Sequence, residues 1–240
     1  MKVRSIYSPN FNKKRRSYKS IKFLIIHYTG MQSERESIIR LCNSKSKVSS
    51  HFVINQKGKI YRLVQDNQIA WHAGKSCWGK YKNLNKTSIG IELVNKGHKF
   101  GYTNFKKKQL SSLIKICKNL IRKYRIKKQN IVGHSDVAPL RKIDPGEKFP
   151  WKELAFEKIG IWHNCNTKIL KKLRKVRISS KFKLEFINNL KKIGYCFDNK
   201  KKANFAKVIK AFQRHYRKKL INGIIDKECL LISQNILKKI

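Results

Sequence analysis

Short apolar runs in the first two thirds of the chain predict strands. Residues 22–28 (KFLIIHY) are apolar and rich in β-branched side chains, which is typical of a strand buried on both faces. Residues 88–94 (SIGIELV) and 130–134 (NIVGH) show the same pattern. The segments 51–55 (HFVIN) and 59–64 (KIYRLV), separated by a short turn, predict a β-hairpin.

Two helices are predicted between these strands. Residues 33–43 suit a helix that begins at Ser33, with Glu36 three positions on as in a capping box. Residues 109–124 place apolar side chains on one helical face, namely Leu110, Leu113, Ile114, Cys117, Leu120, Ile121 and Tyr124. This order of strands and helices predicts an α/β fold with a central mixed β-sheet flanked by helices.

The pattern changes after Trp162. Residues 163–181 are polar and basic and are expected to form a linker. Three helical segments follow, at 183–194, 203–217 and 226–239, with apolar faces formed by Leu184, Ile187, Leu190 and Ile193 and by Val208, Ile209, Phe212 and Tyr216. We therefore expect a first domain over residues 1–162 and a small three-helix domain over 182–240. Few core contacts are expected to cross a boundary in a polar stretch.

The chain is strongly basic. Its 240 residues carry a formal net charge of +45, from 58 Lys and Arg against 13 Asp and Glu. Such a charge suits an anionic partner, but the lysines are spread along the whole chain, and Lys, Ile and Asn, which AT-rich codons encode, are enriched together. No aromatic-basic motif of a known nucleic-acid binder is present, so a specific nucleic-acid partner is not expected.

Cysteine usage and the N-terminus bear on the compartment. The six cysteines show no CxxC pair and no close spacing, which argues against a thiolate metal cage or a disulfide framework. Residues 1–20 lack the apolar segment of a secretory signal and a lipid-attachment cysteine, and no apolar run is long enough for a transmembrane segment. A cytoplasmic protein is expected, with a periplasmic or secreted one reached by another route as the alternative. Oligomeric state is not indicated.

Three residues predict a metal site. His27 and His134 each end a predicted strand, and Asp144 follows ten residues after His134. Two imidazoles and one carboxylate at one sheet edge suit a catalytic zinc ion, which keeps a fourth position for water. The spacing alone also fits structural histidines, and Asp136 is an alternative third ligand.

Several sequence blocks, in this order, resemble the type 2 family of N-acetylmuramoyl-L-alanine amidases, in its AmpD- and AmiD-like branch. The blocks are IIHYTG, VSSHFVI, AWHAGKSCW, SIGIELVN and VGHSDVAPLRKIDPGEKFPW, within about residues 20–162. The resemblance implies the fold of peptidoglycan recognition proteins and of T7-lysozyme-like amidases. It implies zinc-dependent hydrolysis of the amide bond between the N-acetylmuramoyl lactyl group, in the ordinary or the 1,6-anhydro form, and L-alanine of the peptidoglycan stem peptide, in cell-wall turnover or remodelling. A non-catalytic peptidoglycan-recognition protein is the alternative.

The same resemblance implies roles for individual residues. It makes His27, His134 and Asp144 the zinc ligands and places Lys142 and Glu92 in the active site. A lysine ammonium can stabilise the negative charge that develops on the carbonyl oxygen, and a glutamate can carry the proton from water to the leaving nitrogen. The alternatives are a surface lysine for Lys142, and for Glu92 an ion-pair partner or an acceptor that orients a ligand histidine. Leu140 stands where the family usually has Gly.

Further residues are candidates for substrate binding. Trp71 and His72 can line the substrate groove or form a structural loop. Asn85 can contact substrate or shape a turn, and Arg141 can meet the acidic stem peptide or remain solvated. His51 lies within a strand pattern and is expected to be structural. These residues would contact peptidoglycan or muropeptide fragments, the partner that the resemblance implies.

The C-terminal segment resembles the small helical peptidoglycan-binding domain that follows the catalytic domain in AmiD-like enzymes. The matching residues are 190–195 (LKKIGY), 208–215 (VIKAFQRH) and 223–228 (GIIDKE), and Cys229 replaces the usual Thr. A wall-binding module would raise the local concentration of substrate. A generic three-helix bundle is the alternative.

Overall fold

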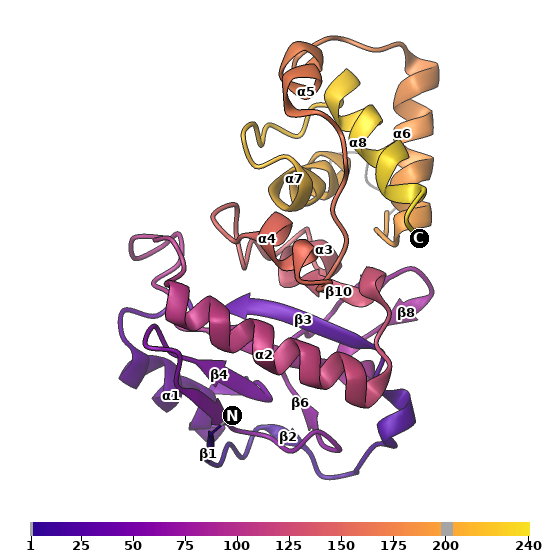
Figure 1. Ribbon diagram of the computed structural model, residues 1–240. Helices are drawn as coiled ribbons and strands as arrows, with labels where there is room; N and C mark the ends of the chain where they lie inside the picture. The colour runs from indigo at the N-terminus through magenta and orange to yellow at the C-terminus, as the bar shows by residue number, and fades with distance from the viewer. Residues whose placement is uncertain (1, 198–203) are drawn as a thin grey trace.

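A six-stranded mixed sheet forms the centre of the molecule, as the computed structural model of residues 2–197 and 204–240 shows (Figure 1). Its strand order is β1 (Val3–Ser5), β5 (Ile60–Arg62), β4 (Phe52–Ile54), β9 (Ser88–Leu93), β3 (Phe23–Tyr28) and β10 (Ile131–Gly133). Only the β4–β5 hairpin pair is antiparallel, and the other neighbours run parallel. The predicted strands and hairpin are therefore confirmed.

Eight α-helices surround and extend this sheet within the described residues. Four belong to the sheet-containing part: α1 (Glu34–Cys42), α2 (Lys107–Tyr124), α3 (His134–Val137) and α4 (Trp151–Phe156). The C-terminal module consists of α5 (Thr167–Leu173), α6 (Ser180–Ile193), α7 (Phe205–Tyr216) and α8 (Lys227–Leu237). Figure 1 shows α2 lying along the sheet and α5 to α8 gathered beyond α3 and α4. The α/β fold class is confirmed.

Short elements complete the chain. Two small antiparallel pairs join β2 (Phe11–Asn12) to β6 (Ile69–Ala70) and β7 (Cys77–Trp78) to β8 (Tyr81–Lys82). Single 3-10 turns are η1 (Tyr18–Ser20), η2 (Ser44–Ser46), η3 (Leu84–Thr87) and η4 (Lys128–Asn130).

Local signals set the limits of the predicted helices. Ser33 caps α1, because its Oγ accepts the Glu36 backbone N–H at 3.1 Å. The Glu36 carboxylate accepts from the Gln32 backbone N–H rather than from Ser33, so only half of the capping box forms. The end of α2 is marked by Arg125 in the left-handed conformation (φ 51°).

The two faces of β3 pack against different partners, because successive side chains point to opposite sides. Leu24 and Ile26 join a core with the buried face of α2, including Leu113 and Leu120. Phe23 and Ile25 face the other way, toward the C-terminal module. His27 continues this second face, so the face that carries the candidate metal ligand is the one that the C-terminal module covers.

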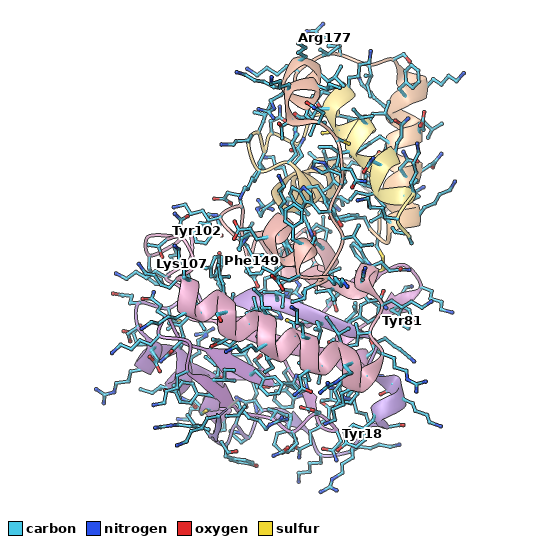
Figure 2. The ribbon with its side chains drawn as sticks, in the orientation of Figure 1. Tyr18, Tyr81, Tyr102, Lys107, Phe149 and Arg177 are labelled. Carbon is cyan, nitrogen blue, oxygen red and sulfur yellow. A yellow bond between two sulfur atoms is a disulfide. The ribbon has the colours of Figure 1, made fainter. Side chains whose placement is uncertain are left out.

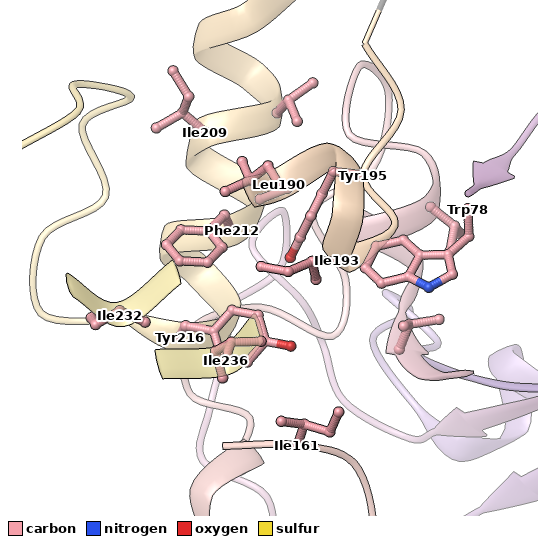
Figure 3. Close-up of a cluster of buried hydrophobic side chains, with 14 of the residues drawn as sticks. Trp78, Ile161, Leu190, Ile193, Tyr195, Ile209, Phe212, Tyr216, Ile232 and Ile236 are labelled. Atoms are coloured by element: carbon pink, nitrogen blue, oxygen red, sulfur yellow. The ribbon is translucent and has the colours of Figure 1, made fainter. Parts of the chain in front are cut away.

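The C-terminal module shares its core with the sheet-containing part, so the expectation of few crossing contacts is wrong. One buried cluster combines Phe23, Trp78 and Val137 with module residues, some of which Figure 3 shows around Tyr195 and Phe212. Burying these side chains together stabilises the pair of parts as one unit. The domain limits themselves stay a prediction.

Details of the module differ from the sequence pattern. The expected linker contains α5, whose Leu170 is buried. On α6 the buried face contains Phe186 in place of the predicted Leu184, which is 59% exposed. The four residues predicted for the apolar face of α7 are all buried, while the predicted start at residue 203 lies outside the described residues.

A disulfide joins the two parts. Cys77 in β7 and Cys196 after α6 are bonded, with their Cα atoms 6.0 Å apart and the two residues 119 positions apart in sequence. The expectation from cysteine spacing is wrong for this pair, because tertiary packing brings together residues that are remote along the chain. None of the described helices is both long and apolar enough to span a membrane.

Candidate metal centre and active-site groove

Two neighbouring parallel strands bring the candidate ligands together. β3 and β10 pair in register from Leu24 opposite Ile131 onward, so both strands lead to the same sheet edge. His27 lies near the end of β3, and His134 follows β10 directly. The loop after α3 returns Asp144 to this edge, where its carbonyl accepts the Ser135 backbone N–H at 2.8 Å.

Three ligand atoms converge at this edge. His27 Nδ1 lies 3.0 Å from His134 Nδ1, and each of these nitrogens lies 3.1 Å from Asp144 Oδ2. All three side chains are buried and form a group able to hold a metal ion. Ligand atoms about 2.0–2.1 Å from a tetrahedral ion lie about 3.3 Å apart, close to these separations.

Hydrogen bonds to the second ring nitrogens define which nitrogen of each histidine is free. His134 Nε2 lies 3.2 Å from the Ala73 carbonyl, which only accepts, so Nε2 carries the proton. Ser88 Oγ donates to the Leu84 carbonyl at 2.6 Å, so His72 Nε2 donates to Ser88, and His72 Nδ1 accepts from His27 Nε2 at 3.0 Å. Both Nδ1 atoms therefore present lone pairs to the centre, as metal coordination requires.

Burial and neighbouring charges change the pKa values of two of the candidate ligands. Burial, with His134 nearby, lowers the pKa of His27 to about 4, so the ring is neutral at physiological pH. Burial alone would raise the pKa of Asp144, but His134 and His27 outweigh it and hold this pKa well below its usual range. A neutral His27 ring and an ionised Asp144 carboxylate are the states in which these two groups bind a metal ion.

Asp136, the alternative third ligand, is excluded by its own bonds. Its Oδ2 accepts the Gly133 backbone N–H at 2.7 Å, and both of its oxygens are bonded to the C-terminal module. The group of candidate ligands therefore includes Asp144 and not Asp136.

Glu92 and Lys142 both line the groove at the centre. The groove encloses about 470 Å³, and its lining also includes Trp71 and the three candidate ligands. Glu92 lies on β9 as the register partner of His27. Its Oε2 is buried and has no hydrogen-bond partner among the described residues. Burial, with Asp144 nearby, raises the pKa of Glu92 to about 8, and Lys142 opposes this rise.

The family of the chain follows from its relatives. A family model for N-acetylmuramoyl-L-alanine amidase matches residues 17–147. The N-acetylmuramoyl-L-alanine amidase AmiD of Escherichia coli K12 is 36% identical over 241 residues, which cover 93% of this chain and 84% of that protein. This chain belongs to the N-acetylmuramoyl-L-alanine amidase family.

Solved structures extend the similarity to the C-terminal module. AmiD from E. coli, in complex with anhydro-N-acetylmuramic acid-L-Ala-D-gamma-Glu-L-Lys, matches with a TM-score of 0.82 and 34% identity, covering 95% of this chain and 93% of that one. AmpDh3 from Pseudomonas aeruginosa, in complex with anhydromuramic pentapeptide, matches with a TM-score of 0.80 and 30% identity, covering 95% and 96%. The amidase therefore shares its two-part architecture with both.

The remaining predicted site residues of the amidase occupy distinct positions. His72 lines the groove but is only 8% exposed and contacts His27 from behind. Asn85 Oδ1 accepts the backbone N–H groups of His72 and Ala73, at 3.2 and 2.7 Å, so its side chain holds this loop. Arg141 donates to the carbonyls of Ala73 and Lys75. Of the four predicted substrate-binding residues, Trp71, His72 and Arg141 line the groove, and His72 and Arg141 also lie beside candidate metal ligands, 3.0 Å from His27 and 3.5 Å from His134.

Some supporting residues gave no signal in the sequence. Tyr102, which Figure 2 labels near Phe149, donates its hydroxyl to the Pro145 carbonyl at 2.6 Å, directly after Asp144. Gly90 leaves room for His72, because a Cβ there would lie 2.5 Å from the ring. Ser88 and Gly90 do lie in the recognised SIGIELVN block, but their contacts to His72 depend on how two distant segments pack.

Proposed function

We propose that this amidase is zinc-dependent and hydrolyses the bond between the N-acetylmuramoyl lactyl group and L-alanine of the stem peptide. The convergence of two imidazole lone pairs and the Asp144 carboxylate within 3.1 Å of one another carries the proposal. Nitrogen and oxygen ligands in a set of three suit a catalytic zinc ion. When bound, zinc would supply Lewis acidity that polarises the scissile carbonyl and lowers the pKa of water.

Glu92 would move the proton. Its Oε2 is buried and unbonded within the described residues, and burial raises its pKa to about 8. A carboxyl group with a pKa near neutrality can take a proton from the attacking water and then deliver it to the leaving nitrogen of L-alanine.

Lys142 would stabilise the developing oxyanion. Its side chain lines the groove beside the ligands and affects the pKa values of both Glu92 and His27. A fixed ammonium directed at the carbonyl oxygen is worth most where charge develops only in the transition state. Trp71 would supply an aromatic face for sugar or peptide, while Asn85 and Arg141 would keep the groove wall in place.

The substrate form is proposed from the relatives. AmiD and AmpDh3 were both crystallised with anhydromuramic peptides. We propose that this amidase also accepts an anhydro-muropeptide.

A second cavity, of about 1240 Å³, lies near the C-terminal module, and we propose that it contacts intact peptidoglycan. That cavity is lined by aromatic residues such as Trp162 and by cations such as Lys218 and Lys219.

The disulfide bears on location. Disulfides persist in oxidising compartments and are rare in the cytoplasm. Because Cys77 and Cys196 are bonded, we propose that the amidase works in the periplasm or outside the cell. Free thiols at both positions in protein isolated from its native compartment would contradict this.

One assay tests the proposed reaction. Purified anhydro-muropeptide and sacculi are incubated with the metal-free amidase, with added zinc, and with zinc plus chelator. Release of free stem peptide only in the zinc sample is expected. Binding of the muropeptide by fully zinc-loaded protein without cleavage would overturn the proposal and favour a recognition protein. The double variant Lys218→Glu/Lys219→Glu tests the cavity near the C-terminal module. It is expected to lose binding to sacculi while its turnover of the soluble fragment stays unchanged.

A further inference from the structure

The C-terminal module bonds directly to the turn that carries a metal ligand. Asp136 lies two residues after His134 and is 1% exposed. The Tyr195 hydroxyl donates to its Oδ1 at 2.8 Å, and His215 Nδ1 donates to its Oδ2 at 2.7 Å. The Gly133 N–H donates to the same Oδ2 at 2.7 Å. Two of the three donors to this buried carboxylate therefore come from the module.

Both module donors are held rigidly in place. The His215 ring stacks on Trp151, with the ring centroids 3.9 Å apart and the planes 15° apart. Tyr195 packs on Trp78 with centroids 4.8 Å apart, and Figure 3 shows the two rings next to each other. Gly194 permits this approach, because a Cβ there would lie 2.3 Å from the Trp78 ring. Donors fixed in this way lose little freedom when they bond to Asp136.

Asp136 is coupled to two of the three ligands. It occupies the third position of α3, a single turn that begins at His134. Its bond to the Gly133 N–H sets the angle at which β10 enters this turn. The preceding residue, Ser135, donates its N–H to the Asp144 carbonyl at 2.8 Å. A shift of Asp136 would therefore move both His134 and Asp144.

We propose that Tyr195 and His215 are positioning residues for the metal centre. By holding Asp136, they keep α3 in the arrangement that directs His134 Nδ1 and Asp144 Oδ2 toward one point. Without them, a buried carboxylate keeps one of its three donors, and the turn would move to rehydrate it. The C-terminal module thus completes the metal centre, in addition to any role in substrate binding. This inference rests on the proposal that the three ligands hold zinc.

Substitutions in the full-length chain separate hydrogen bonding from packing. His215→Phe keeps an aromatic ring on Trp151 but removes the donor, whereas His215→Asn keeps an N–H close to the position of Nδ1 but removes the ring. Tyr195→Phe removes only the hydroxyl. Phe186→Leu is the control, because this buried residue belongs to the module core and has no bond to Asp136.

Zinc affinity is measured by competition with a chromophoric chelator, at a temperature where every metal-free variant is folded. Tyr195→Phe/His215→Phe is expected to bind zinc about 10- to 100-fold more weakly, the range for residues that orient metal ligands. His215→Asn and Phe186→Leu are expected to bind within about threefold of the parent while unfolding at lower denaturant concentration. At saturating zinc, kcat for a soluble fragment should fall in the double variant while KM stays unchanged.

Two outcomes have distinct meanings. If the parent protein itself fails to bind zinc, the proposed function fails. If the parent binds zinc and the double variant binds equally tightly, or if affinity simply follows stability across all variants including Phe186→Leu, then the positioning role is overturned and the module contacts are structural only.

Discussion

His27 and Glu92 are register partners on adjacent parallel strands, β3 and β9. Side chains of register partners project from the same face of a sheet, so a candidate metal ligand and a candidate proton carrier stand side by side at one edge. Their different environments follow from their bonds. The His27 ring is fixed by His72, whereas Glu92 Oε2 has no bonded partner among the described residues.

Replacing Glu92 by Gln is expected to abolish most activity and leave the structure intact. The amide has the same shape, and a site that raises the carboxyl pKa to about 8 tolerates a neutral group. We expect kcat to fall about 10²- to 10⁴-fold, the range for loss of a general acid–base group. Zinc content and the free energy of unfolding are measured in parallel, and unaltered turnover would show that Glu92 carries no proton.

Lys142→Ala is expected to retain zinc and to lose about 10²- to 10³-fold in kcat, the scale for one oxyanion donor. Lys115→Ala, on the exposed face of α2 and outside both cavity linings, is the matched control and should turn over normally. The comparison uses steady-state kinetics on a soluble muropeptide at saturating zinc. Equal rates for the two variants would show that Lys142 is only a surface charge with no role in turnover.

Asp144→Asn is expected to lose the metal, because an amide is a far weaker ligand than a carboxylate. Glu147→Gln, three residues further on, removes a carboxylate that pairs with His98 and should retain about one zinc per chain. Elemental analysis after dialysis distinguishes them. Full zinc occupancy in Asp144→Asn would show that the carboxylate is not a ligand.

His72→Ala is expected to weaken zinc binding about 10- to 100-fold, because His72 fixes the orientation and proton position of His27. His51→Ala leaves a cavity of the same size nearby, but His51 bonds to the Gly90 backbone N–H and to no ligand. It should therefore lose stability while keeping its zinc affinity. Chelator competition on both proteins decides the point, and equal weakening in both would show a general packing effect.

The metal-free amidase is expected to lose stability as the pH falls from about 6.5 toward 4. Burial lowers the pKa of His27 to about 4 and of His51 to about 3, so in this range the unfolded chain takes up protons that the folded chain does not. Each such histidine contributes a slope of up to about 1.4 kcal/mol per pH unit. The raised pKa of Glu92 contributes to the change of stability with pH in the opposite direction. This contribution comes from one group and is outweighed by those of several histidines.

Denaturant unfolding of the chelated protein between pH 4 and 7 measures this slope. His51→Gln should flatten it, because one of the depressed groups is removed. An equal slope in the parent protein and in His51→Gln would mean that His51 is protonated in the folded state.

The sequence alone determined the sheet, its main helices and the two histidines of the candidate metal centre. Local rules suffice for these features, since β-branched apolar runs predict buried strands and strand-end histidines at one edge predict a metal centre. The resemblance pointed to Glu92 and Lys142, and the structure places both in the groove.

Only the tertiary structure showed why Asp144 rather than Asp136 joins the candidate centre and how the two parts depend on each other. By spacing alone Asp136 and Asp144 were both candidates for the third ligand, and the family resemblance favoured Asp144. In the structure the two differ because Tyr195 and His215, from a distant segment, bond to Asp136. The Cys77–Cys196 bond likewise joins residues 119 positions apart. The periodicity of apolar residues indicates which face of a helix or strand is buried. It does not indicate which other element packs against that face, because the hydrophobic effect is non-directional and many apolar faces are compatible with one another.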